Sequence, residues 1–125
     1  MYLKKQFIPY ELALELKELG FDEECFRHYT EDNKMLLGSA NTKYYTLAPL
    51  YQQVFDFFRN KYNIHTSFKP VFGEKNYNKY KCNIYVNERI VQVMKYEFPD
   101  NPYFDSYEEA RLECLKKLIE IVNKK

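Results

Sequence analysis

The segment from Asp105 to Val122 limits the fold most strongly, because it has the pattern of an amphipathic helix with one broad apolar face. At about 100° per residue, its charged side chains fall opposite its apolar ones. The apolar face comprises Tyr107, Ala110, Cys114, Leu115, Leu118, Ile119, Ile121 and Val122. Ser106 and Glu109 have the spacing of a capping box at the first turn. Such a helix has to bury its apolar face, which predicts a sheet built by the preceding segments.

Three consecutive segments before this helix have the residue types and alternation of β-strands. They span residues 64–72, 80–86 and 90–98. Pro70 cannot donate to a strand ladder, which favours an edge position for the first segment. Short turns separate the segments, so the sequence predicts a three-stranded antiparallel meander with the C-terminal helix packed on it.

The first half of the chain predicts mainly helices. Leucines at helical spacing indicate a helix over residues 10–19, which Gly20 ends. A second, short helical piece is expected over residues 23–29, and Met35–Leu37 is expected to form a short strand. A longer central helix is predicted from residue 46 to residue 62.

These elements predict an α+β fold. The length of 125 residues is typical of one domain. We therefore expect a single domain over residues 1–125, with a helical N-terminal part (1–45) and an α-β-β-β-α unit (46–125).

Charge and hydropathy narrow the function classes. No apolar run approaches the roughly 18 residues of a membrane span, and the N-terminus lacks the apolar core of a signal peptide. These patterns predict a cytoplasmic protein without a membrane partner. The balance of 19 basic against 18 acidic residues makes a dedicated nucleic-acid binder less expected.

The residues that carry catalysis or metal binding are sparse and scattered. Cys25, Cys82 and Cys114 are an odd, widely spaced set in apolar surroundings, which predicts buried thiols rather than disulfides. Cys25 and His28 form a C-x-x-H pair, which is half of a zinc-binding motif. No second Cys/His pair follows it, and His65 has no Cys or His partner nearby in the sequence. The sequence therefore predicts no metal, no cofactor and no catalytic residue, and a protein that is not an enzyme.

A basic and aromatic cluster occupies residues 69–89. It comprises Lys69, Lys75, Lys79, Lys81 and Arg89, interleaved with Tyr77, Tyr80 and Tyr85. On a hairpin, such a set can hold phosphates and stack on bases. The alternative is an exposed sheet face on which lysines prevent edge-to-edge pairing.

Aromatic residues are abundant, with 13 Tyr and 10 Phe. Phe57 falls outside the apolar stripe of the central helix, which predicts an exposed ring. Exposed aromatic side chains are frequent at protein interfaces. Phe57 and Tyr85 are therefore the candidate interface residues.

The order of the second half, helix, three strands and helix, resembles that of double-stranded-RNA-binding domains. In that family the second helix opens with Ser-Lys-Lys-x-Ala-Lys, whose lysines hold phosphates across the major groove. Here Ser106 and Ala110 match and Arg111 keeps the last charge, while Tyr107 and Glu108 replace the other lysines. The resemblance implies a shared topology from which the RNA-binding contacts are lost.

Residues 10–22, 51–59 and 107–121 also resemble small uncharacterised proteins encoded by gut Bacteroidota and their phages and mobile elements. This resemblance implies an accessory gene and carries no activity with it. Together with the surplus of aromatic residues, it predicts a non-enzymatic interaction protein that binds an unidentified protein or itself. The alternative is a nucleic-acid-binding module that uses the hairpin 69–89.

Overall fold

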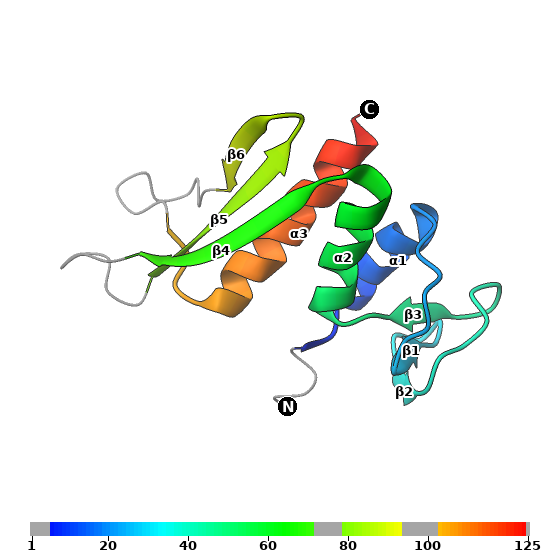
Figure 1. Cartoon of the computed structure of the whole chain (residues 1–125). Coiled ribbons are helices and arrows are strands. Elements are labelled where there is room, and N and C mark those ends of the chain that lie inside the picture. Colours follow the sequence, from blue (N-terminus) through cyan, green and yellow to red (C-terminus); the bar gives the residue numbers. More distant parts are fainter. Residues whose placement is uncertain (1–5, 72–78, 94–102, 125) are drawn as a thin grey trace. The chain divides into compact units, whose positions relative to one another are not determined.

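The computed structural model describes residues 6–71, 79–93 and 103–124 (Figure 1). The elements are α1 (Tyr10–Glu18), β1 (Arg27–Tyr29), β2 (Met35–Leu37), β3 (Thr46–Ala48), α2 (Tyr51–Tyr62), β4 (His65–Val71), β5 (Lys79–Val86), β6 (Arg89–Val93) and α3 (Tyr107–Asn123). Two three-stranded antiparallel sheets accompany these helices, which confirms the mixed α and β class. The chain divides into two compact units, Met1–Phe57 and Phe58–Lys125. The expectation of a single domain stays a prediction.

The first unit contains α1 and a small sheet of order β2-β1-β3. Helix α1 ends in a Schellman motif, in which Phe21 N–H bonds Leu16 C=O and Gly20 N–H bonds Lys17 C=O. Gly20 has φ +93°, a conformation that costs glycine little. The predicted first helix and its glycine stop are confirmed.

The helix predicted over residues 23–29 is wrong, because Arg27–Tyr29 forms strand β1 in the middle of the small sheet. His28 and Tyr29 are both buried, so side chains on both faces of the strand lie in the core. The Tyr29 hydroxyl also donates to the Ile8 carbonyl at 2.6 Å. Tertiary packing thus overrides a weak helical pattern, whereas the strand predicted at Met35–Leu37 is confirmed.

The predicted start of the central helix at residue 46 is also wrong. Thr46–Ala48 forms β3, and Ala48 precedes Pro49, which disfavours helical backbone at that position. The side chain of Gln53 accepts from the Leu50 amide at 3.0 Å, which marks Leu50 as the residue before the first helical turn.

The second unit contains the sheet β4-β5-β6 and α3 (Figure 1). Strands β5 and β6 join through Asn87 and Glu88, which both have positive φ, as in a two-residue type I′ hairpin. Residue 72, the end of the strand predicted over 64–72, and residues 94–98, the end of the strand predicted over 90–98, lie outside the described residues.

Helix α3 lies on one face of this sheet, mainly against β5. Residues alternate along β5, so Cys82, Ile84 and Val86 are buried while their neighbours are partly exposed. Cys114, Leu115 and Leu118 of α3 are fully buried, as its predicted apolar face requires. The Ser106 hydroxyl accepts from Glu109 N–H at 3.1 Å, which confirms Ser106 as the cap.

Candidate interaction surfaces

The second sheet has one face toward α3 and one face on the opposite side. The opposite face carries part of the predicted basic cluster. Lys69 pairs directly with Lys81, and Ser67 pairs with Asn83. Directly paired residues of antiparallel strands point to the same face. Tyr85 shares this face because it lies two and four positions along β5 from Asn83 and Lys81. We call Ser67, Lys69, Lys81, Asn83 and Tyr85 the outer face.

Lys69 and Lys81 bring two positive charges side by side, which opposes strand pairing unless an anion lies between them. Neither lysine has an ion-pair partner in the ranges 6–71, 79–93 and 103–124. Lys79 differs, because its ammonium group pairs with Asp105. Within the described part of the chain, the outer face therefore has two lysine charges that no acidic side chain pairs with.

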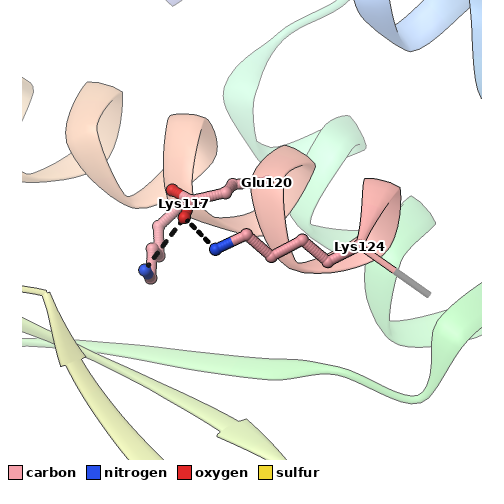
Figure 2. Close-up of polar contacts among 3 residues, drawn as sticks. All are labelled: Lys117, Glu120 and Lys124. Atoms are coloured by element: carbon pink, nitrogen blue, oxygen red, sulfur yellow. Dashed lines mark hydrogen bonds and ion pairs between the residues drawn. The ribbon is translucent and has the colours of Figure 1, made fainter.

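The exposed side of α3 shows the opposite arrangement, in which the charges are paired. Figure 2 shows Glu120 between two ammonium groups, at 2.8 Å from Lys124 and 3.5 Å from Lys117. The hydrogen bond from Lys124, together with both positive charges, holds the pKa of Glu120 below its ordinary value. Glu113 and Lys116 form a further pair at 3.2 Å. This helix surface is a solvated, neutralised face with little attraction for an anion.

Tyr85 is tied to the outer face by its hydroxyl. The hydroxyls of Tyr85 and Ser67 share a hydrogen bond of 2.9 Å. This bond lowers the pKa of Tyr85, with smaller contributions from Asn83 and from the charge of Lys69. The phenol thus reaches across from β5 to β4, on the same face as the paired lysines.

Two other described members of the predicted basic cluster, Arg89 and Tyr80, do not join this face. Arg89 pairs with Val86, which lies on the α3-facing side of β5. Arg89 is therefore on the face opposite to that of Lys81. Tyr80 is on that side as well, and its ring lies 6.1 Å from the ring of Tyr107. Lys75 and Tyr77 lie outside the described residues.

The residue of α3 that keeps the charge of the RNA-binding family is not available to a phosphate. Arg111 is buried, and its guanidinium lies 5.4 Å from the centre of the Tyr107 ring. The ring that replaces a family lysine therefore covers the one basic side chain of the motif that this chain retains.

The prediction that Phe57 is an exposed ring is wrong. Phe57 is only 7% exposed, and its ring meets Phe21 edge-on with centroids 5.3 Å apart. The prediction assumed that α2 buries only one narrow apolar stripe, and Phe57 lies outside that stripe. The packing of Phe21 after α1 widens the buried face, so Phe57 belongs to the core of the first unit.

The structure reveals a different apolar surface, at the edge of the small sheet. Strand β2 is an outer strand, with β1 on one side of it (Figure 1). Leu36 is 46% exposed and Leu37 is 76% exposed, and Phe26, beside the start of β1, is 70% exposed. We call Phe26, Met35, Leu36 and Leu37 the β2 edge. A strand of three apolar residues was readable in the sequence, but its lack of cover was not.

The hydrogen bonds of the hairpin fix which main-chain groups of β2 point outward. Gly38 N–H bonds Phe26 C=O, and Thr30 N–H bonds Lys34 C=O. Bonded pairs alternate along an antiparallel ladder, so Leu36 is bonded to its partner His28. The N–H and C=O groups of Met35 and Leu37 then face away from β1, where the described residues provide no further strand.

A shallow cleft of about 420 Å³ lies near the turn of this hairpin. It is lined by Thr30, Glu31, Asp32, Tyr44 and Tyr45. The ammonium group of Lys43 lies 5.6 Å from the centre of the Tyr44 ring, and the ring of Tyr45 contacts His28 edge-on. Both rings are thus engaged within the chain.

The cysteines are buried, whereas each histidine borders one of the two surfaces, because His28 pairs with Leu36 and His65 pairs with Tyr85. Cys25, Cys82 and Cys114 are buried free thiols, as predicted. Burial, with Glu23 nearby, raises the pKa of Cys25 to about 12. His28 is held by a 2.8 Å hydrogen bond between Nδ1 and Gly38 O. Within the described ranges, no group of three His, Cys, Asp or Glu side chains is arranged to hold a metal ion.

Within the described part of the chain, no helix has the length and hydropathy that crossing a bilayer requires. No protein-family model, curated protein or solved structure matches the chain. The two resemblances noted in the sequence therefore stay predictions, and the candidate function has to be argued from the surfaces themselves.

Proposed function

We propose that this chain is a non-enzymatic interaction protein that binds a protein through the β2 edge. We further propose that it is an accessory factor of phage or mobile-element type that acts in the cytoplasm. The observation that carries the binding role is the exposure of Leu37, at 76%, on an outer strand with outward-facing main-chain groups.

An exposed apolar outer strand is a template for pairing with another strand, and proteins usually protect such edges with charge or proline. None of the three residues of β2 is charged or a proline. Pairing supplies affinity through main-chain hydrogen bonds, while neighbouring side chains supply specificity. Phe26 and Leu37 provide apolar area for that second contribution.

The test compares Leu37→Lys with Leu14→Lys in the tagged full-length protein. Both leucines are exposed residues of the first unit, but Leu14 lies on α1, away from the β2 edge. Proteins that co-purify after nuclease treatment are quantified by mass spectrometry. We expect Leu37→Lys to reduce the specific partner by about tenfold or more, and Leu14→Lys to retain it. Equal recovery by the two variants would contradict binding at the β2 edge.

A second candidate function is nucleic-acid binding by the outer face. The observation that favours it is the direct pairing of Lys69 with Lys81 without an ion-pair partner in the described ranges. Two neighbouring lysines can hold the phosphates of a single strand, and Tyr85 supplies a ring on the same face for stacking on bases.

This candidate is tested by salt titration of a fluorescent single-stranded oligonucleotide. Binding through phosphates falls steeply as salt rises. Lys81→Glu should abolish it, while Lys34→Glu, the same charge change at an exposed turn of the first unit, should leave it intact. Affinity that is insensitive to salt, or equal in both variants, would exclude the outer face.

A further inference from the structure

We propose that the partner at the β2 edge is a second copy of this chain, with the two β2 strands paired antiparallel about a two-fold axis at Leu36. This inference rests on the proposed function, whose binding surface it shares. Each three-stranded sheet would thereby continue into the other.

The pattern of main-chain groups in β2 is complementary to itself in this register. A two-fold axis at Leu36 places Met35 opposite Leu37 of the second copy, and Leu37 opposite Met35 of that copy. Both residues have outward-facing N–H and C=O groups, as the alternation of the hairpin bonds requires. About four hydrogen bonds can therefore form between the copies, and the inward-bonded Leu36 faces its own symmetry mate.

Charge does not oppose this pairing. The strand itself contains only Met and Leu. The nearest basic residue, Lys34, would lie opposite Gly38 of the other copy. The two Lys34 backbones are then about 14 Å apart along the strands, which is beyond the screening length of about 8 Å at physiological salt.

The side chains complete the contact. Leu36 meets Leu36 and Met35 meets Leu37, so each exposed apolar group of the strand gains an apolar neighbour. The paired segments are short, at three residues each. We therefore expect a dimer that dissociates on dilution rather than a permanent one.

Disulfide trapping tests the register directly. The native cysteines are buried, so a cysteine introduced on β2 is the accessible thiol in the described part of the chain. Facing residues of a non-bonded pair have Cα atoms about 4.5 Å apart, within the range that a disulfide spans. Leu36→Cys should therefore cross-link to itself on mild oxidation with oxidised glutathione. Leu14→Cys is the control and should stay monomeric on a non-reducing gel.

Two further variants test the position of the axis. Met35→Cys and Leu37→Cys should not cross-link alone, because diagonal Cα atoms lie about 7–8 Å apart. An equimolar mixture of the two should cross-link, because Met35 faces Leu37. Leu37→Pro removes one outward N–H donor of β2 and leaves the hydrogen bonds to β1 intact. If Leu36→Cys still forms a dimer when combined with Leu37→Pro, pairing of the two β2 strands is contradicted.

The outcomes separate this inference from the proposed function. If Leu36→Cys stays monomeric while Leu37→Lys still loses a different protein partner, self-pairing is overturned and binding at the β2 edge stands. If Leu36→Cys stays monomeric and Leu37→Lys changes nothing, both are overturned. Cross-linking in the predicted pattern supports both.

Discussion

Phe57 of α2 packs edge-on against Phe21, with their ring centroids 5.3 Å apart. Phe21 follows the glycine stop of α1, so this contact joins the end of one helix to the side of another within the first unit. An aromatic pair of this geometry adds to the stabilisation from burial. Some of the many aromatic residues of this chain are thus buried in the core.

Truncation of this ring should destabilise the fold. We expect Phe57→Ala to lower the free energy of unfolding by about 3–5 kcal/mol, because it removes a buried ring and leaves a cavity. Phe26→Ala, at an exposed ring of the same unit, should change it by less than about 0.5 kcal/mol. Urea titration measures both. Similar values for the two variants would contradict the assignment of Phe57 to the core.

The buried thiol of Cys25 predicts a loss of stability at high pH. Its pKa is raised from 9.0 to about 12 by burial and by Glu23. The folded state therefore holds this proton more tightly than the unfolded state. The stabilisation is complete below pH 9 and is lost as the pH rises toward 12. Cys25→Ala should flatten the unfolding free energy over this range, and an unchanged slope would exclude Cys25 as its source.

The paired lysines predict opposite effects of one substitution on stability and on anion binding. Lys81→Glu places a carboxylate opposite Lys69 and should stabilise the sheet by about 0.2–1 kcal/mol. The same change reverses one charge of the outer face, so any affinity for phosphates should fall. Thermal unfolding and oligonucleotide binding are measured on one preparation. Destabilisation by Lys81→Glu would show that these side chains do not face each other.

Removal of the Ser106 cap of α3 should lower the stability of the fold modestly. Ser106→Ala removes the hydroxyl that accepts from Glu109 N–H and should lower the free energy of unfolding by about 1 kcal/mol. Ser106→Asp keeps an acceptor at this position and should retain most of the stability. An equal cost for both variants would indicate that the hydroxyl matters for a reason other than capping.

In the second half of the chain, the predictions that the structure confirms are those whose signals are local. The alternation in residues 80–86 and the cap at Ser106 each specify one element without help from distant residues. The first half failed where distant residues decide the structure. His28 and Tyr29 lie in a strand because β2 and β3 flank them, a relationship that no local pattern contains.

The candidate surfaces were predicted in part for the same reason. Lys69, Lys81 and Tyr85 were singled out as a cluster, and strand register then brought them to one face. Arg89 was included because it is close in sequence, but the register with Val86 removes it from that face. The β2 edge was missed because exposure depends on what the rest of the chain leaves uncovered.

The most direct test of pairing through the β2 edge is an NMR dilution series of the ¹⁵N-labelled protein. From dilute to concentrated protein, the amide signals of Met35 and Leu37 should move downfield as they form hydrogen bonds. The Leu36 amide, already bonded to β1, should move much less, and Leu37→Pro should abolish the change at Met35. Amide signals of Met35 and Leu37 that stay fixed over the whole series would contradict self-pairing at this edge.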